Sequence, residues 1–217
     1  MSFTPNQLEE AISEAKVKSA ERKKRAFVET VEISTALREI DLKNPANRIN
    51  IEATVPHDLG GKSQVAIFAE GDLAVRAAEA GIKTISRDEI ERISKEPKEA
   101  KKLANEYAFF LAEPPLMAVC ARFLGKILGP RGKMPKPIPP RVELDRFVAR
   151  YNRIVKIRIK TTPVINAPIG KANLSDSVLA ENATAILQQL TAKLPKGATQ
   201  VKSVCFKTTM GPAVRAK

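Results

Sequence analysis

Hydrophobic and polar positions follow two different patterns along this chain. Near the two ends, the segments 49–55 and 155–160 alternate between apolar and polar residues, which is typical of strands buried on one face. In the middle, the runs 65–69 and 108–112 are continuously apolar, as in strands of a parallel sheet that is covered on both faces. The pattern therefore predicts an α+β part at the two ends and an α/β part between them.

Helices complete the terminal part. Residues 5–23 place apolar side chains at helical spacing after Thr4, a suitable N-cap, and residues 175–193 repeat that spacing. Two more strands are predicted, over 26–33, which is rich in β-branched residues, and over 201–208. We expect one α+β domain built from residues 1–61 and 152–217.

The middle part alternates strands with helices. A helix over 73–80 stops at Gly81, a strand follows at 83–85, and Ser86 with Glu89 forms a capping box for the next helix. A further helix over 116–128 is expected to end at Gly129-Pro130. The alternation predicts an inserted α/β domain over 62–151, joined to the terminal domain by two crossing strands that form a hinge near residues 62 and 152.

The positive charge is concentrated in the last part of the chain. The net charge is +13, yet residues 1–120 hold 18 basic and 20 acidic residues, whereas residues 121–217 hold 19 basic and 4 acidic ones. Such an excess points to a polyanion, and a basic surface kept for solubility is the alternative. Because this part contains a proline-rich loop and a strand and no basic amphipathic helix, nucleic acid is a better partner than a membrane.

The run 125–133 resembles a phosphate-binding loop but fails its pattern. Walker A requires a glycine five positions before the Gly-Lys pair and Ser or Thr after it, and this chain has Ile127 and Met134 there. What remains is a loop from Gly129 to Pro140 whose shape is set by glycine and proline. Its cations could contact phosphates, or the loop could simply be solvated. The cations of the loop are Arg131, Lys133 and Lys136, and Lys126 precedes it closely.

The sequence gives little support for a catalytic site, a metal site or a disulfide. His57 is the single histidine, and no CxxC or HxxxH accompanies it, so we expect a turn or surface residue and no triad or zinc site. Cys120 and Cys205 are expected to be small buried side chains in a reducing compartment. The acidic residues of the first half are expected on solvated helix faces. Without a secretory signal or an apolar run of about 20 residues, the chain is expected to be soluble and intracellular.

Three motifs carry a family resemblance. The runs GKILGPRGKMPKP (125–137), NAPIGK (166–171) and TTMGP (208–212) resemble the universal ribosomal proteins of the mobile side stalk of the large subunit, in their archaeal form. Small hydroxyl residues and glycine in the last run could fit an RNA backbone closely, or the run could be no more than the end of a strand. AFVETVEI (26–33) and VPHDLGGK (55–62) extend the resemblance over nearly the whole chain.

The resemblance implies a fold and a function. The family has a discontinuous split α+β domain with an inserted Rossmann-like α/β domain, no cofactor and no enzymatic activity. It binds large-subunit ribosomal RNA beside other large-subunit components and assists release of tRNA from the exit site. It also binds its own messenger RNA and represses the translation of that RNA. Such a protein is cytoplasmic, away from membranes, and a monomer when free. The matching RNA-binding positions are Phe27, Ser203, Thr209, Met210 and Gly211, with Thr208 and Lys171 as neighbours.

Two departures and two rivals qualify this assignment. Bacterial relatives tend to have Lys at Ala26 and His at Asn166, so those two contacts are not carried over. A nucleotide-using enzyme is one rival, and the absence of GxGxxG and Walker A argues against it. A non-ribosomal assembly factor is the other; such relatives usually carry long charged extensions, whereas this chain ends at Lys217.

Overall fold

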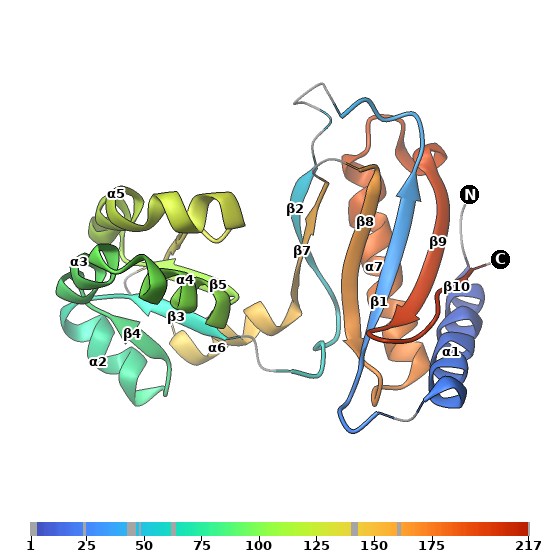
Figure 1. Ribbon diagram of the computed structural model, residues 1–217, viewed down its shortest axis with the longest axis horizontal. Coiled ribbons are helices and arrows are strands. Elements are labelled where there is room, and N and C mark those ends of the chain that lie inside the picture. The colour runs from blue at the N-terminus through green and yellow to red at the C-terminus, as the bar shows by residue number, and fades with distance from the viewer. Residues whose placement is uncertain are drawn as a thin grey trace. The chain divides into compact units, whose positions relative to one another are not determined.

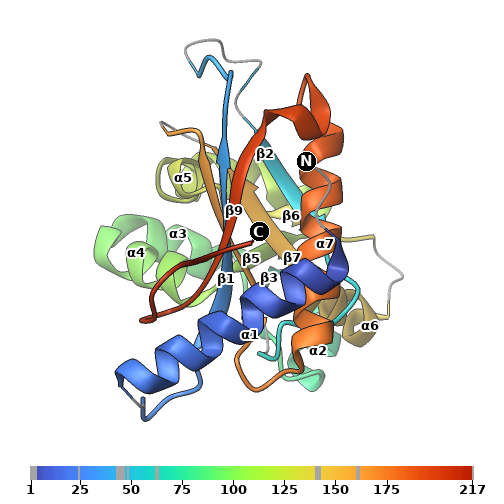
Figure 2. The same ribbon diagram turned by 90° about the vertical axis from the view of Figure 1, so that its right-hand side faces the viewer.

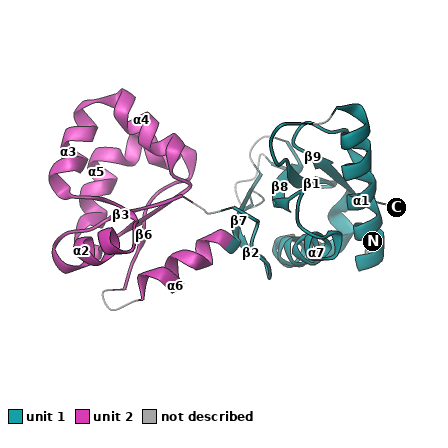
Figure 3. Ribbon diagram, turned by 90° about the horizontal axis from the view of Figure 1, so that it is seen from below, with its two compact units in different colours: residues 1–61, 153–217 teal, residues 62–152 magenta. Residues whose placement is uncertain are grey.

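The chain forms two compact units in a computed structural model that describes residues 4–23, 25–42, 47, 49–61, 64–139, 143–159 and 162–216 (Figure 1). Unit 1 consists of residues 1–61 and 153–217, and unit 2 of residues 62–152 (Figure 3). The chain thus leaves unit 1 once, completes unit 2, and returns.

Unit 1 is built on an antiparallel sheet of four strands in the order β10-β9-β1-β8. The strands are β1 (Thr30–Leu37), β8 (Val164–Lys171), β9 (Val201–Thr208) and β10 (Val214–Arg215). Two 18-residue helices, α1 (Pro5–Arg22) and α7 (Asp176–Lys193), pack against each other and against this sheet (Figure 2).

The sheet buries one face because its side chains alternate. Val31 and Ile33 of β1 are fully buried in a core with Ile12 of α1 and Leu179 of α7, whereas the residues between them are half exposed. Each such side chain removed from water contributes about 1.5–3 kcal/mol. The helices therefore hold one face of the sheet and leave the other outward.

A second, two-stranded sheet completes unit 1. β2 (Asn50–Thr54) pairs antiparallel with β7 (Ile154–Arg158). Both strands were predicted, although Lys160, the last residue of the predicted strand, lies outside the described residues. Two 3-10 helices, η2 (Arg150–Arg153) and η3 (Gly197–Gln200), precede β7 and β9. The chain segment near residue 152, predicted as one of two strands that connect the domains, is therefore a 3-10 helix. Residues 62–63 of the other predicted connection lie outside the described part.

Unit 2 is a parallel sheet in the order β4-β3-β5-β6. Every residue of β3 and β5 is buried, which confirms the prediction of strands covered on both faces. The strands are β3 (Val65–Phe68), β4 (Lys83–Ile85), β5 (Phe109–Ala112) and β6 (Lys136–Pro137). The helices are α2 (Gly71–Glu79), α3 (Arg87–Lys95), α4 (Pro97–Glu106), α5 (Pro114–Arg131) and α6 (Leu144–Ala149).

The predicted end of α5 at Gly129-Pro130 is wrong. Pro130 lies in the last turn, where its missing N–H removes a single intrahelical bond. The helix ends instead at Gly132, whose φ of 67° lets its N–H donate to the Gly129 carbonyl, while the Lys133 N–H donates to that of Leu128. The loop expected from Gly129 therefore begins only after Gly132.

The first strand of unit 1 is also displaced from its predicted position. β1 begins at Thr30, where pairing with Lys171 starts, and residues 26–29 precede the sheet. β-branched composition alone could not place the start, because pairing partners define it. Sequence patterns missed β8 altogether, since Pro168 and Gly170 interrupt it. Proline is tolerated there because β8 is the edge strand of the four-stranded sheet.

Candidate nucleic-acid interface

The outward face of the four-stranded sheet carries small and polar side chains. Across its middle, Cys205 of β9, Ser34 of β1 and Asn166 of β8 lie in register, and Ser203 lies opposite Ala36 one row further along. All five side chains are exposed or half-exposed. A face of this kind can approach the backbone and 2′-hydroxyls of RNA closely. Cys205, expected to be buried, is only half-buried there, whereas Cys120 in unit 2 is buried as predicted.

One end of this face is closed by the turn from Thr208 to Gly211. The Gly211 N–H donates to the Thr208 carbonyl at 3.2 Å. The Thr209 hydroxyl accepts from the Thr30 N–H at 3.0 Å and donates to the Thr30 carbonyl at 3.3 Å. The Met210 N–H donates to Glu29 Oε1 at 2.9 Å. Side chains and backbone therefore fix the turn against the start of β1.

Glu29 is the centre of this network. Besides Met210, its carboxylate accepts from the Ser19 hydroxyl at 2.9 Å and from the Thr208 hydroxyl at 3.2 Å. Burial opposes ionisation, but the three hydrogen bonds and the charge of Arg25 outweigh it and hold the pKa of Glu29 below its ordinary value. Glu29 is thus a half-buried acceptor outside the helices, an exception to the prediction that the acidic residues of the first half lie on solvated helix faces.

Gly211 is required by close packing. A Cβ at this position would lie about 2.4 Å from Thr208 Oγ1 and 2.9 Å from both Cβ and Oγ of Ser19. Ser19 is itself buried on α1, and Thr208, whose hydroxyl also donates to Ser19 Oγ at 2.8 Å, is only 1% exposed. Thr208, expected among the RNA-binding residues, therefore supports the turn from inside.

Large apolar side chains project from the two segments that Glu29 joins. Phe27 is 55% exposed, Val28 52% and Met210 54%. Exposed apolar groups that cluster at one place mark interaction sites more often than scattered ones do. Phe27 and Val28 also line a pocket of about 230 Å³ beside the end of α1. These side chains can pack on the sugars and bases of a bound nucleic acid.

The structure distributes the remaining predicted residues along the sheet. Lys171, at the end of β8, donates from Nζ to the Thr30 hydroxyl at 3.0 Å. Its side chain lies against Gly60, where an added Cβ would come within 3.1 Å of Lys171 Cβ. Ser203 lies five residues before Thr208 on β9, which is on the order of 17 Å away along a strand. The predicted residues thus mark both ends of one face, and the Asn166 amide lies between them.

Sequence reasoning missed two cations beside this face. Lys23 and Arg25 line the same pocket as Phe27, and the Arg25 Nε is buried without a hydrogen-bond partner among the described residues. Their place was obscured because the first 60 residues are balanced in net charge. The basic run at the end of the predicted helix, close to Phe27 in sequence, was the signal available.

The four basic residues predicted in unit 2 have different surroundings. Lys126 and Arg131 are exposed on α5, and Arg131 donates to the Ile127 carbonyl at 3.3 Å. Lys133 Nζ donates to the carbonyls of Ala104 and Tyr107 at 2.7 and 2.8 Å, and burial lowers its pKa. Lys136 lies 6.0 Å from the Tyr151 ring centroid. Lys126 and Arg131 are therefore the cations most available to a polyanion.

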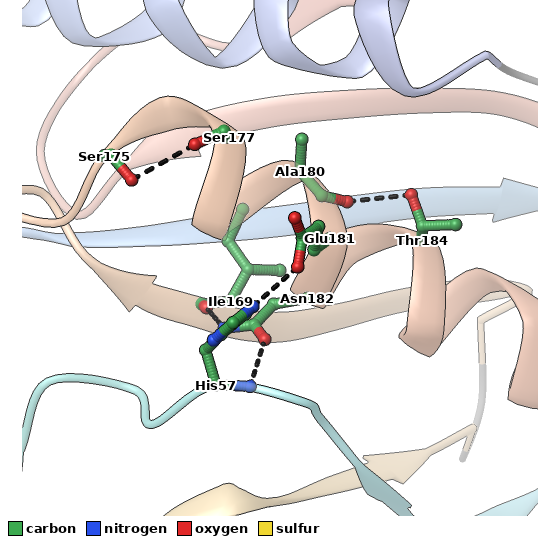
Figure 4. A network of polar contacts seen from close by, with 8 residues as sticks. All are labelled: His57, Ile169, Ser175, Ser177, Ala180, Glu181, Asn182 and Thr184. Carbon is green, nitrogen blue, oxygen red and sulfur yellow. Dashed lines mark hydrogen bonds and ion pairs between the residues drawn. The ribbon is translucent and has the colours of Figure 1, made fainter.

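His57 lies in a bend and is half-exposed, in agreement with the prediction of a turn or surface residue (Figure 4). Its Nε2 lies 2.6 Å from Glu181, and its backbone N–H donates to Asn182 Oδ1 at 3.0 Å. Asn182 is fully buried and donates in turn to the Ile169 carbonyl at 2.9 Å. The segment around His57 is thereby fastened to α7 and β8. Ser175 and Ser177, the two serines drawn, are hydrogen-bonded to each other.

The parallel sheet of unit 2 lacks the features of a nucleotide site. In such sheets ligands bind at the carboxyl ends of the strands, where helix N-termini offer N–H groups. Here β5 is followed by Glu113 and two prolines, and the Glu113 carboxylate accepts from the Glu70 N–H at 3.2 Å. Negative charge and missing N–H groups disfavour phosphate. The described residues also contain no group of His, Cys, Asp and Glu suited to a metal ion, and no described helix is long and apolar enough to cross a membrane.

Comparison with known proteins agrees with this picture. Residues 17–212 match the family described as "Ribosomal protein L1p/L10e family". Three relatives are called "Large ribosomal subunit protein uL1". Those of Thermococcus kodakarensis and Pyrococcus horikoshii are each 43% identical over the whole chain, covering 100% and 98% of the relative. That of Thermofilum pendens is 47% identical over 96% of this chain and 92% of its own length. The family consists of ribosomal proteins and not of enzymes, and this chain belongs to the ribosomal protein L1p/L10e family, with archaeal relatives along its full length.

Proposed function

We propose that the chain is a structural protein of the large ribosomal subunit that binds ribosomal RNA through unit 1. The observation that carries the proposal is the turn Thr208–Gly211, held rigidly by Glu29 at the edge of an outward sheet face. A binding surface that is ordered before the RNA arrives loses less conformational entropy on binding. The relatives named as large-subunit proteins support the same assignment.

Each predicted residue has a defined part in this proposal. Phe27 and Met210 pack on sugar and base surfaces, and Ser203 with Thr209 bonds 2′-hydroxyls or phosphates. Gly211 lets the turn pack closely. Lys171 and Thr208 hold the surface in position through Thr30 and Glu29, which are their hydrogen-bond partners.

Unit 1 serves as the RNA-binding domain in this proposal, and unit 2 as an inserted domain. Lys126 and Arg131 of unit 2 provide further electrostatic contacts, either with RNA or with tRNA leaving the exit site. The same surface of unit 1 binds the chain's own messenger RNA. Because one surface cannot hold two RNAs at once, only protein in excess of ribosomal RNA would repress its own translation.

The working environment follows from these partners. The protein acts in the cytoplasm within the large subunit, beside other components of that subunit, and requires no cofactor. When free it is a monomer.

The test is binding of the purified protein to a large-subunit stalk RNA fragment and to an unrelated hairpin over a salt series. A specific site keeps a preference of about a thousandfold or more at physiological salt. Equal affinities that fall together as salt rises would identify a general polycation and overturn the proposal.

A further inference from the structure

The pocket beside the end of α1 contains a polar atom whose hydrogen-bonding capacity is unused. Arg25 lines this pocket of about 230 Å³, and its Nε is buried without a hydrogen-bond partner among the described residues. Buried donors are nearly always paired in folded proteins, because an unpaired one loses its water without compensation. A ligand with acceptor oxygens would pair this donor once the half-exposed Arg25 side chain turns toward the pocket.

The charges around the pocket favour an anion. Lys16, also in its lining, is already committed: its ammonium donates to Asp176 at 2.5 Å and to the Leu174 carbonyl at 2.7 Å. Lys23 is exposed, and Arg25 is half-exposed. Glu29 contributes the one carboxylate of the lining that is not already paired with a lysine. Among the described lining residues, a single positive charge is thus left over.

Glu29 does not fill the role of that anion. Its two oxygens already accept from Ser19, Thr208 and the Met210 N–H, and no ion pair joins it to Arg25 in the described structure. The guanidinium retains its fork of donors, which matches the geometry of a phosphate. Phe27 and Val28 form an apolar wall of the same pocket, against which a sugar or base could lie.

We propose that this pocket binds a backbone phosphodiester of the RNA, with the Arg25 guanidinium as its main ligand and Lys23 as a second cation. The inference rests on the proposed RNA-binding function and adds a contact that lies off the sheet face. Its consequence is that the RNA continues from the turn Thr208–Gly211 past Glu29 toward the end of α1.

The experiment combines Arg25→Gln with ethylation interference on the stalk RNA, using the full chain. Arg25→Gln should lower affinity about tenfold, the scale of a charge-assisted bond, and make the log–log salt dependence less steep by about one unit. Ethylation of one particular phosphate should weaken binding of the natural chain and have no effect on the variant. Arg25→Lys should keep the salt dependence and lose part of the affinity.

Arg22→Gln is the matched control, since Arg22 is an exposed arginine of the same helix end that does not line the pocket. With Arg22→Gln, ethylation of the same phosphates should weaken binding as with the natural chain. If every phosphate whose ethylation weakens binding of the natural chain also does so for Arg25→Gln, the pocket proposal is overturned while the proposed function stands. If the natural chain shows no preference for the stalk RNA, both fail. Inorganic phosphate at about 10 mM, roughly ten times the dissociation constant of a millimolar site, is the probe for a free anion. If it stabilises the natural chain but not Arg25→Gln against unfolding, and ethylation of no RNA phosphate depends on Arg25, the pocket binds free anions and the proposal is wrong.

Discussion

Two glycine-containing segments of this chain build different surfaces. In the turn Thr208–Gly211 of unit 1, a carboxylate holds the backbone and a large apolar side chain points outward. In the segment from Gly129 to Lys136 of unit 2, Lys133 donates to two carbonyls, whereas Arg131 is exposed. The first surface is suited to recognising shape, and the second to attracting charge. Composition predicts the charge of the second segment, but it does not show that Lys133 is bonded inside while Arg131 is exposed.

Gly211→Ala should have the largest effect. The new Cβ would lie 2.4 Å from Thr208 Oγ1 and 2.9 Å from Ser19, so the turn must move. We expect a loss of unfolding free energy of about 3 kcal/mol and loss of measurable preference for the stalk RNA. Denaturant unfolding and RNA titration measure the two effects.

Gly129→Ala is the matched control from the other segment. Gly129 lies inside α5, and a Cβ there would meet no atom within 4 Å. The helix propensity gain of alanine, about 0.5–1 kcal/mol, is opposed by the contact of its Cβ with the following Pro130, so stability should change little and RNA binding should be unchanged. If the two alanines behaved alike, the contrast between the segments would be unfounded.

Glu29→Gln should cost about 2 kcal/mol of unfolding free energy at neutral pH, since it weakens three hydrogen bonds to a charged group. The pKa of Glu29 is lowered in the folded chain relative to its ordinary 4.5. Its contribution is therefore complete above pH 4.5 and disappears as the pH falls through the folded pKa.

The measurement is the difference in unfolding free energy between the natural chain and Glu29→Gln from pH 7 to pH 3. The difference should shrink toward acid. A difference that is constant over this range would mean that the carboxylate charge does not stabilise the turn.

Met210→Ala should separate shape from charge. Met210 is 54% exposed and its backbone makes the bond to Glu29, so truncation should leave stability unchanged. Affinity for the stalk RNA should fall about tenfold, the value of one well-packed apolar contact, with no change for an unrelated hairpin. Arg131→Gln should instead weaken both RNAs by the same small factor, and comparison of the two variants over a salt series decides whether the surfaces differ as described.

Lys133→Met should have the smallest effect on function. Its ammonium bonds two carbonyls at the end of α4, so unit 2 should lose about 1 kcal/mol. RNA affinity and its salt dependence should remain as they are. A change in the salt dependence would show that Lys133 contacts phosphate after all.

Regular patterns in the sequence predicted much of the fold. The strict alternation of β2 and β7, the apolar runs of β3 and β5, and the capping box formed by Ser86 and Glu89 are local signals, and the structure confirms them. α4 was missed because it buries only Ala100 and Ala104, which give a weak periodic signal. β8 was missed because proline and glycine are read as strand breakers.

The site was less predictable than the fold. The family motifs identified the turn Thr208–Gly211 and Phe27. The bonds that hold them join residues far apart in the sequence, such as Met210 with Glu29 and Lys171 with Thr30. Spacing along the chain carries no signal for such contacts. The role of Arg25 could not be predicted for the same reason, because its pocket forms only when α1, residues 23–29 and the ends of β8 and β9 come together.

The pairing of β1 has a consequence for synthesis of the protein. β1 ends at Leu37, and its partners β8 and β9 begin only at Val164 and Val201. At a synthesis rate of about 5–20 residues per second, roughly 6–30 s pass between the synthesis of β1 and that of its partner strands. Unit 2 is contiguous in the sequence and can fold in this interval. The outward face, with residues of both chain ends in register across it, is therefore the last surface to form. A chain released early would have a folded unit 2 and no RNA-binding face, so RNA would select only complete molecules.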